Sequence, residues 1–481
     1  MMSYEYDVLV IGGGAGGLTA SKTAHGLGKR VALLEKTDRL GGECTWTGCI
    51  PSKALIKTAE VAYHAKQLDR YGLRAEQSIV LDTSNVMPYV RSIIQDDYQS
   101  HTPEKIRSLG IDLLFGNAKF LDPHRVQLDE RIITFNKAII TTGSHPFVPP
   151  IEGLDTVPYL TNSNLFNLER LPKSLIILGG GAIGAEMASA LNRLGVAVTV
   201  IEMNDRILPK EDAELVAMLT DTLLKEGVTI KTGMQATKVE KEGDGVRVIV
   251  KDTSGAQHEL QAEKLLVAVG RRPNIEGLGL EAIGVQANKR GIVVNNKQQT
   301  TTKNIYAAGD VVGPYQFSHM AWYQAVVAVR NMVVPIFKQK LNYTDVIWVT
   351  FTAPELASAG LTEEQAREQY GDSIIVYRKP YAEIDRAVTD RTKNGLAKFI
   401  CNKKGYLLGI HILGARAGDI IHEAQVIKAF KKRFDSIHSV IHAYPTYAEL
   451  TWHAAKKAYV KRLESNFFVI LLKKLFFKRK K

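Results

Sequence analysis

The first elements that the hydrophobic pattern predicts are a strand, a turn, a helix and a second strand. An apolar run from Tyr6 to Ile11 leads directly into Gly-Gly-Gly-Ala-Gly-Gly at 12–17, and a second run, Val31 to Leu34, ends at Glu35. Short apolar runs bounded by turn signals are typical of buried strands, and the stretch between the two runs is predicted to be helical. The segment therefore predicts one strand-turn-helix-strand unit.

The same pattern occurs a second time along the chain. Leu175 to Leu178 leads into Gly-Gly-Gly-Ala-Ile-Gly at 179–184, and Val196 to Ile201 ends at Glu202. In both copies the first glycine precedes the acidic residue by 23 positions. Because a repeated supersecondary unit is far more specific than one Gly-rich motif, the repeat predicts two dinucleotide-binding sites.

Each unit needs glycine at three points, for the tight turn, for the approach of the backbone to a pyrophosphate, and for close helix packing. The pyrophosphate then lies at a helix N-terminus, where free N–H groups and the helix dipole favour negative charge. The carboxylate that follows accepts hydrogen bonds from ribose hydroxyls and repels a 2′-phosphate, so Glu202 favours NADH over NADPH, with Arg206 close by in the sequence. The alternative, two solvated strand ends, is disfavoured by the matched spacing. The cofactor-binding candidates are Gly12, Gly14, Gly17 and Glu35 in the first unit and Gly179, Gly181, Gly184, Glu202 and Gly270 for the second.

The remainder of the chain divides at two breaks and then changes pattern. The first break is marked by Pro146, Pro149 and Pro150, and the second lies near 271–274. An apolar strand is predicted from Lys303 to Ala308, before Gly309-Asp310. Beyond Thr344 the segments Ile374 to Tyr377 and Ala397 to Ile400 alternate as in an antiparallel sheet. The sequence predicts an α/β protein with two Rossmann-like domains and a C-terminal α+β domain.

Length and composition indicate several domains and no membrane span. The chain has 481 residues, more than one hydrophobic core usually supports, and its hydrophobic and charged fractions are 45% and 23%. No apolar run approaches the roughly 20 residues that cross a bilayer. Three cysteines are too few for a secreted disulfide scaffold. These observations predict a cytoplasmic protein.

The densest chemical signal is the sequence Gly-Gly-Glu-Cys-Thr-Trp-Thr-Gly-Cys-Ile-Pro-Ser-Lys at 41–53. Five residues of regular helix rise about 7.5 Å, beyond the usual Cα separation of a disulfide, so a bond between Cys44 and Cys49 requires a distortion that Gly48 permits. Pro51 suits the first turn of a helix, which predicts that Cys49 lies just before the helix N-terminus. There the helix dipole and Lys53 would lower the thiol pKa. Two buried structural cysteines are the alternative.

Cys-x-x-x-x-Cys followed by Ile-Pro-Ser-Lys resembles the class I pyridine nucleotide-disulfide oxidoreductases, which include dihydrolipoamide dehydrogenase, glutathione reductase and mercuric reductase. The resemblance extends from Gly12 to about Glu449. It implies that Cys44 is the interchange thiol that attacks substrate, that Cys49 is the thiolate facing the flavin, and that Lys53 lies beside flavin N5 and pairs with Glu186. Electrons would pass from NAD(P)H through FAD to the cysteine pair and on to a disulfide or another thiol-reactive acceptor, with no resident metal.

The resemblance also gives the predicted domains their roles. Thr142, Gly143 and Asp310 resemble FAD contacts, and the sequence from Phe351 to Glu355 resembles the opening of the dimerisation domain. A homodimer is therefore expected. The implied domains are FAD-binding over 1–150, NAD(P)-binding over 151–271, a segment completing the FAD-binding domain over 272–344, dimerisation over 345–465, and a basic hydrophobic tail over 466–481.

One position departs from the disulfide-reductase pattern. Those enzymes carry a His-Pro-Thr near the C-terminus, followed by Glu, which supplies the acid and base for the substrate thiol in the partner subunit's site. This chain has Tyr444-Pro445-Thr446 with Glu449. A free tyrosine titrates near pH 10 and is a poor proton acceptor at neutral pH, which argues against ordinary dihydrolipoamide turnover. His442, two residues away, could replace the missing histidine only in a different orientation.

Mercuric reductases also carry a residue other than histidine at this position, so a metal-ion reductase is an alternative function. Those enzymes carry a pair of vicinal cysteines near the C-terminus, which this chain lacks. Its one cysteine besides Cys44 and Cys49 is Cys401, which lies in a predicted strand. A third hypothesis is a redox-sensing flavoprotein with little turnover that docks on a membrane.

The net charge of +12 is concentrated in the tail. Residues 461–481 hold eight Lys and Arg against one Glu, a net charge of +7, which leaves +5 for the other 460 residues. We therefore expect no nucleic-acid partner. The tail combines Phe-Phe-Val-Ile-Leu-Leu at 467–472 with basic residues, as in helices that lie peripherally at an anionic membrane. Packing against the dimer and a disordered end are the alternatives.

Overall fold

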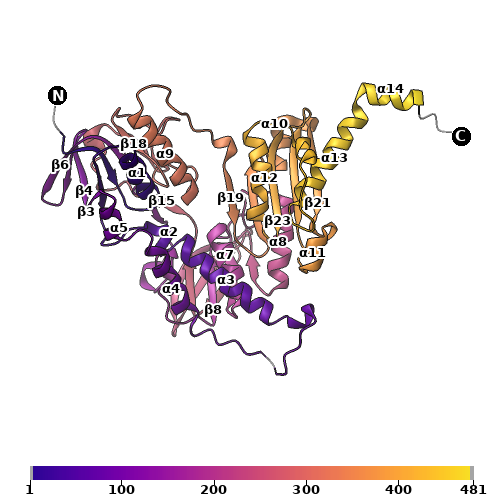
Figure 1. Cartoon of the computed structure of the whole chain (residues 1–481). Helices are drawn as coiled ribbons and strands as arrows, with labels where there is room; N and C mark the ends of the chain where they lie inside the picture. The colour runs from indigo at the N-terminus through magenta and orange to yellow at the C-terminus, as the bar shows by residue number, and fades with distance from the viewer. Residues whose placement is uncertain (1–3, 78, 477–481) are drawn as a thin grey trace.

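The computed structural model describes residues 4–77 and 79–476 and contains three structural units (Figure 1). The first is built on a seven-stranded sheet in which β3-β2-β1-β6 and β18-β6 are parallel and β6-β5-β4 is antiparallel. Helices α1 (Ala15–Gly26) and α9 (Ser318–Val333) pack together on one face. The strands are β1 (Tyr6–Ile11), β2 (Val31–Glu35), β3 (Asp112–Phe115), β4 (Ala118–Asp122), β5 (Arg125–Leu128), β6 (Arg131–Ile140) and β18 (Ile305–Ala307).

The apolar composition of β1 follows from its position in this sheet. Val8, Leu9, Val10 and Ile11 are all at least 96% buried, because the strand is covered on both faces. β18 pairs with β6 although more than 160 residues separate them, so the chain returns to its first sheet after building the second unit. The predicted strand at 303–308 is thus present and is shorter than expected.

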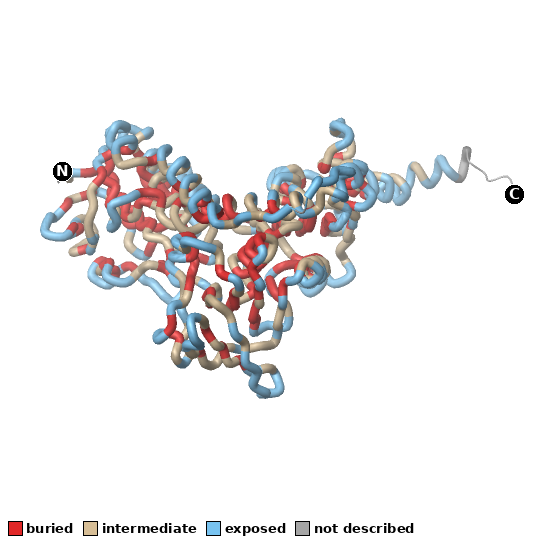
Figure 2. Tube along the Cα trace, turned by 90° about the horizontal axis from the view of Figure 1, so that it is seen from below, coloured by how far each residue is buried: buried red, intermediate tan, exposed pale blue. Residues whose placement is uncertain are grey.

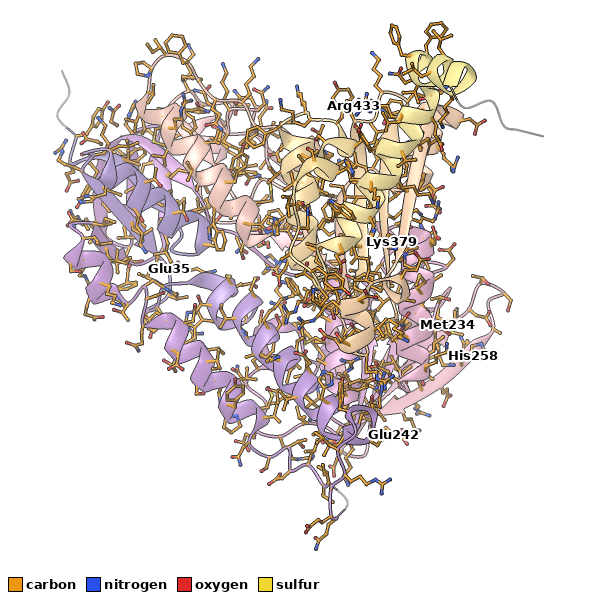
Figure 3. All side chains as sticks on the ribbon, turned by 45° about the vertical axis from the view of Figure 1, so that its right-hand side comes forward. Glu35, Met234, Glu242, His258, Lys379 and Arg433 are labelled. Atoms are coloured by element: carbon orange, nitrogen blue, oxygen red, sulfur yellow. The ribbon has the colours of Figure 1, made fainter. Side chains whose placement is uncertain are left out.

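The second unit repeats the first on a smaller scale. Its parallel sheet has the order β10-β9-β8-β14, and a three-stranded antiparallel sheet, β11-β12-β13, lies beside it. Figure 3 labels Met234, Glu242 and His258 around this antiparallel sheet. The strands are β8 (Ser174–Leu178), β9 (Ala197–Ile201), β10 (Thr229–Lys231), β14 (Lys264–Val267), β11 (Gln235–Glu242), β12 (Gly245–Lys251) and β13 (Gln257–Ala262), and the helices are α7 (Ala182–Arg193) and α8 (Ala213–Lys225).

Two short strands lie at the two predicted breaks. β7 (Ser144–Pro146) ends at the first of the three prolines, β15 (Arg271–Pro273) lies in the second break, and the two strands pair antiparallel with each other. The chain leaves the first unit along one strand and returns along the other. The two segments that connect the first unit to the second therefore lie side by side.

Four helices follow β2: α2 (Gly42–Trp46), α3 (Cys49–Ala65), α4 (Val86–Tyr98) and α5 (Pro103–Ser108). α3 packs against α4, and it also packs against α7, which belongs to the second unit. Smaller elements are α6 (Asn162–Leu165), β16 (Ala287–Asn288) and β17 (Gly291–Ile292). α3 thus joins the two nucleotide-binding units.

The third unit is an antiparallel sheet of order β19-β20-β23-β22-β21, with the expected pairing of 374–377 and 397–400. Helices α12 and α13 pack on it. The strands are β19 (Ile347–Thr350), β20 (Glu355–Gly360), β21 (Ile374–Pro380), β22 (Leu396–Asn402) and β23 (Leu407–Gly414), and the helices are α10 (Glu363–Tyr370), α11 (Asp385–Thr389), α12 (Ala417–Ala429), α13 (Glu449–Ser465) and α14 (Phe467–Phe476). The predicted fold class, α/β with two Rossmann-like units and a C-terminal α+β unit, is confirmed.

Buried residues fill the interior of each unit, whereas the described side chains of α14 are exposed apart from Val469, which is partly buried (Figure 2). No helix of residues 4–77 and 79–476 is both long and apolar enough to cross a membrane.

Candidate active site

The two Gly-rich turns have almost the same geometry. Gly12 and Gly179 each have φ +103°, a left-handed conformation that favours glycine at the tight turn. A Cβ atom on Gly17 would lie 1.7 Å from the carbonyl oxygen of Gly12, and one on Gly184 would lie 2.0 Å from that of Gly179. Each helix can approach its strand this closely only because the third glycine has no side chain.

The second glycine of each motif lies at the helix start. Gly14 and Gly181 are the N-cap residues of α1 and α7, and neither helix has a capping side chain. N–H groups of the first turns can therefore bind an anion such as a pyrophosphate. A Cβ on Gly42 would lie 2.8 Å from Gly14 Cα, so this groove also depends on a glycine opposite it.

The two acidic residues bind their own Gly-rich turns. Glu35 Oε2 accepts from the backbone N–H of Gly13 and Glu202 Oε2 from that of Gly180, both at 2.7 Å. Both carboxylates therefore lie beside the turn that would hold the pyrophosphate. Arg206 is paired with Glu364 at 3.2 Å. Glu35 and Glu202 are thus not merely solvated strand ends.

Asp310 is held at the junction of the first unit with the returning chain. Its Oδ2 atom accepts from Ser144 Oγ at 2.7 Å, and Arg271 Nε donates to the same Ser144 Oγ at 2.8 Å. The Arg271 guanidinium also pairs with Glu43, the residue before Cys44. Burial raises the pKa of Glu43, and Arg271 opposes this effect.

Thr142 and Gly143 bind Asn274 on the returning chain. Thr142 Oγ1 donates to the Asn274 carbonyl at 2.7 Å, and Asn274 N donates to Gly143 O at 2.9 Å. Gly270 has φ +143° and leads into β15. The predicted FAD-contact residues of the first unit thus lie where two distant segments meet.

The expected distortion between the cysteines is present. α2 ends at Trp46, Gly48 adopts φ −124° and ψ −110°, and α3 starts at Cys49 itself, so Cys49 is the first residue of the helix and not the residue before it. Cys44 and Cys49 are both partly exposed free thiols, and their side chains hydrogen-bond to each other. The break between α2 and α3 therefore brings the two sulfur atoms together.

This hydrogen bond separates the two pKa values. It lowers the pKa of Cys49 to about 6 against the opposing effect of burial, and the Ser318 hydroxyl and the Lys53 charge act in the same direction. The same hydrogen bond, together with burial, raises the pKa of Cys44 far above its usual value. The reduced pair thus holds one thiolate, on Cys49, and one thiol, on Cys44. The predicted contribution of Lys53 is present, and the largest cause is the neighbouring thiol, which the sequence did not predict.

The expected pair of Lys53 and Glu186 is present and joins the three units. Lys53 Nζ lies 2.9 Å from Glu186 Oε2 and 4.3 Å from the centre of the Phe351 ring. Glu186 is largely buried in α7, and its other oxygen accepts from Phe351 N at 2.9 Å. Glu186 thereby fixes the position of Lys53 one turn after Cys49.

Ser318 is a site residue that the sequence did not predict. Its Oγ atom lies 3.3 Å from Cys49 Sγ, and it is the first residue of the 16-residue helix α9. Cys49 thus lies at the start of α3 and beside the start of α9. The contact spans 269 residues of sequence, and no local motif indicates it.

Tyr444 and Glu449 lie elsewhere in the chain, on the C-terminal unit. Tyr444 is 69% exposed and its hydroxyl donates to Asp385 Oδ2, at the start of α11, at 2.7 Å. This hydrogen bond and the Asp385 charge raise the Tyr444 pKa. α11 and α2 are well separated in Figure 1, so one chain does not bring Tyr444 to its own cysteines.

The histidine that could replace Tyr444 is already bound. His442 Nε2 lies 2.6 Å from Glu423 Oε1 of α12, and its Nδ1 lies 2.9 Å from Val440 O. Glu449 Oε2 is buried and has no hydrogen-bond partner in the described part of the chain. Cys401 is fully buried in β22, as its predicted structural role requires.

The fold and the site define a class of protein. Two dinucleotide-binding turns flank a dithiol whose members carry different charges, beside the pair of Lys53 with the largely buried Glu186. Such a molecule is an oxidoreductase that combines two nucleotides with a redox-active cysteine pair.

Comparison with known proteins identifies the family. Residues 6–330 match the pyridine nucleotide-disulphide oxidoreductase family, and residues 346–455 match its dimerisation domain. A dihydrolipoyl dehydrogenase of Bacillus subtilis (strain 168) is 36% identical over 94% of this chain and 96% of its own. A mercuric reductase of Bacillus cereus is 33% identical over 93% of this chain and 70% of its own.

A solved structure of similar fold is the Cu(II) complex of the HOCl-induced flavoprotein disulfide reductase RclA from Escherichia coli. It is 28% identical, has a TM-score of 0.84, and the match covers 95% of this chain and 100% of that one. The chain therefore belongs to the pyridine nucleotide-disulphide oxidoreductase family.

Membership of this family gives the activity and the cofactors. The chain is an FAD-dependent NAD(P)H disulfide oxidoreductase, and its dimerisation domain indicates a homodimer. FAD, when bound, would supply the electron transfer from NAD(P)H to the cysteine pair. The grooves at Gly12–Gly17 and Gly179–Gly184 fit two dinucleotides, since a Cβ on any of several glycines would collide with backbone atoms there.

Proposed function

We propose that the cysteine pair passes its electrons to a thiophilic metal ion, cupric or mercuric, in preference to a dithiolane disulfide such as lipoamide. Cys44 is the interchange thiol and Cys49 the thiolate that faces the flavin, with Lys53 and Glu186 positioned beside them. The observation that carries the proposal is Tyr444, whose hydroxyl is bound to Asp385.

Reduction of a disulfide needs a base and then an acid. The Cys44 thiol has to lose its proton to attack, and the leaving thiolate of the substrate has to gain one. Both the hydrogen bond and burial keep Cys44 protonated. Tyr444, whose raised pKa keeps its hydroxyl protonated at neutral pH, cannot accept that proton.

A thiophilic ion avoids this requirement. When two cupric ions are reduced to two cuprous ions, the Cys44 thiol and the Cys49 thiolate together lose two electrons and one proton and form a disulfide, and the proton passes to water. The Cu(II) complex of RclA and the mercuric reductase relatives support this acceptor class. With three cysteines in the chain, capture of the ion depends on Cys44 and Cys49 themselves.

Glu202 supports NADH as the electron donor. Its carboxylate is buried beside Gly180 and would repel a 2′-phosphate, while Arg206, the nearby cation, is paired with Glu364.

Steady-state turnover of the holoenzyme tests the acceptor. With NADH and with NADPH, we expect kcat/KM for cupric or mercuric ions to exceed that for lipoamide by roughly 100-fold, the usual contribution of one acid-base group. Tyr444→His should raise lipoamide turnover about tenfold or more, and Tyr444→Phe, which removes the hydroxyl without adding a base, should not. Equal turnover of lipoamide and metal ions by the natural protein would overturn the proposal.

We also propose peripheral contact between the C-terminal tail and a membrane. Phe467 and Phe468 are each 71% exposed on α14, which supports burial of this helix in another apolar phase. Deletion of 466–481 followed by liposome co-sedimentation tests the contact, and undiminished binding would exclude it.

A further inference from the structure

α14 extends from the end of α13 away from the body of the molecule (Figure 1). The Asn466 side chain caps the helix by accepting from Phe468 N at 2.9 Å. Leu471 and Leu472 are 40% and 51% exposed, in addition to the two phenylalanines. Lys473 is exposed as well, so the helix presents both apolar and cationic side chains.

Three segments near the end of α13, from which α14 extends, place lysines at one end of the C-terminal unit. The β22–β23 turn carries Lys403 and Lys404, the chain after α12 carries Lys431 and Lys432, and the last turns of α13 carry Lys461. All five are exposed. We call these five lysines the basic end.

Hydrogen bonds and ion pairs of two arginines hold these segments together. Arg433 donates to the Lys404 carbonyl and lies 2.9 Å from Asp435 Oδ1, while Arg462 lies 2.5 Å from Asp435 Oδ2. Phe434 N also donates to Gly405 O at 2.9 Å. Figure 3 shows Arg433 at the same end of the unit as α14.

The lysines of the basic end keep their charge unpaired. The side chain of Asp435 is 3% exposed and is neutralised by both arginines. Within the described residues none of the five lysines, nor Lys473, forms an ion pair. A cavity of about 380 Å³, lined by Tyr406, Leu407, Lys428, Lys431 and Lys432, lies in the same region.

We infer that the basic end and α14 together form a docking surface for an anionic lipid bilayer. This inference deepens the proposed peripheral contact and rests on it: the apolar side chains of α14 enter the interface while the folded lysines bind lipid phosphates. The sequence carries further basic residues at 474 and 478–481, the last four outside the described residues. The occupant has to supply both negative charge and an apolar phase, which a bilayer does and a nucleic acid does not.

Co-sedimentation of the full-length, FAD-loaded dimer tests the inference. The probes are vesicles of phosphatidylcholine alone and of phosphatidylcholine mixed with phosphatidylglycerol. The natural protein should bind the mixed vesicles much more tightly, and added salt should weaken this binding. Lys403→Gln with Lys432→Gln should weaken it by roughly 30-fold, about fivefold for each charge lost.

The matched charge control is Lys241→Gln with Lys251→Gln on the antiparallel sheet of the second unit, where both lysines are exposed. This variant should bind like the natural protein. If both double-lysine variants lost the same amount of vesicle binding, or if the natural protein bound both kinds of vesicle equally, the basic end would have no role in docking. The proposed apolar contact of the tail would not be affected by that result.

The apolar half is tested by Leu471→Ser with Leu472→Ser, which should weaken binding about tenfold or more. Leu73→Ser with Leu109→Ser, at two other exposed leucines, should not. No binding by the natural protein would end both the inference and the proposed contact.

Two other occupants would also overturn the inference. Deletion of 466–481 that turns the dimer into a monomer would assign α14 to a second copy of the chain. Tighter binding to duplex DNA than to mixed vesicles would assign the basic end to nucleic acid. NADH turnover with metal ions, measured without lipid, should be the same in all these variants. This measurement tests the proposed electron acceptor independently of the membrane-docking inference.

Discussion

Cys49 keeps a negative charge because three separate parts of the chain surround its sulfur with hydrogen-bond donors or positive charge. Cys44 donates from α2, Ser318 lies at the start of α9, and Lys53 lies one turn along α3. The three contributions outweigh burial, which alone would raise the pKa. A thiolate at this position is therefore a property of the assembled first unit.

Ser318→Ala should raise the pKa of Cys49 from about 6 by roughly one unit, since a hydrogen bond to a charged group contributes about 1.5 kcal/mol. The two-electron-reduced protein should show a long-wavelength absorption between thiolate and flavin. As the pH falls, the Ala variant should lose this absorption at a higher pH than the natural protein does. Alkylation of Cys49 by iodoacetamide, followed by mass spectrometry, should show the same shift. Ser318→Thr keeps the hydroxyl and should titrate like the natural protein; an unchanged midpoint in the Ala variant would remove Ser318 from the site.

The residues of the site differ in how far the sequence revealed them. Cys44, Cys49 and Lys53 belong to one local motif, and Glu186 follows a second one, so the resemblance located all four. Ser318 could not be found this way, because its contact with Cys49 depends on how α9 packs on the first sheet. The roles assigned to Tyr444 and Glu449 stay predictions.

At the scale of the element, two of the three glycines of α1 have opposite surroundings. A Cβ on Gly17 would lie 1.7 Å from Gly12 O, whereas one on Gly26 would meet no atom within 4 Å. Both residues are helical, so Gly→Ala changes the helix propensity in the same way at both positions. A difference between the two variants in stability or FAD retention therefore reports contact with the Gly-rich turn.

Gly17→Ala should therefore push α1 away from β1 and abolish retention of FAD, with a loss of stability of about 2 kcal/mol or more. Gly26→Ala should retain FAD and gain about 0.5 kcal/mol, because alanine is the better helix former. Flavin absorbance after gel filtration and thermal unfolding measure both effects. FAD retained by Gly17→Ala at the level of Gly26→Ala would show that the first Gly-rich turn does not bind the cofactor.

Elements with strong local patterns were predictable and those without were not. β1, β2, β8 and β9 appear at the expected positions within one residue, because their apolar runs are continuous. β7 and β15 are three residues each, and only their mutual pairing makes them strands. The start of α3 was misplaced by one residue, which changed the position of Cys49 from before the helix to its first residue.

At the scale of the whole molecule, a buried ion network joins the second unit to the C-terminal unit. Lys398 of β22 is 3% exposed and lies within 2.9 Å of carboxylates of Asp212, Glu214 and Glu363. Burial would raise the pKa of Glu363, but hydrogen bonds from Lys398 and Arg367 hold it at about 2. No sequence pattern predicted this network, because its members come from α8, α10 and β22 and meet only in the assembled fold.

Removal of the central cation should separate the two units. Lys398→Met leaves three carboxylates without their shared partner, one of them the buried Asp212, and should cost about 3 kcal/mol or more. Lys225→Met, which breaks the exposed pair of Lys225 and Asp221 within α8, should change stability by about 0.5 kcal/mol at most.

The same network gives the stability a dependence on pH whose sign follows from Glu363. Its pKa is lower in the folded chain than the ordinary value of 4.5, so its contribution is complete above about pH 4.5 and is lost as the pH falls towards 2. Lys398→Met should reduce this acid-dependent loss, because Glu363 then keeps only its ion pairs with Arg367 and Arg378, which are more exposed than Lys398. Thermal unfolding between pH 7 and pH 3 measures it, and parallel curves for the Lys398→Met and Lys225→Met variants would show that the network does not hold the units together.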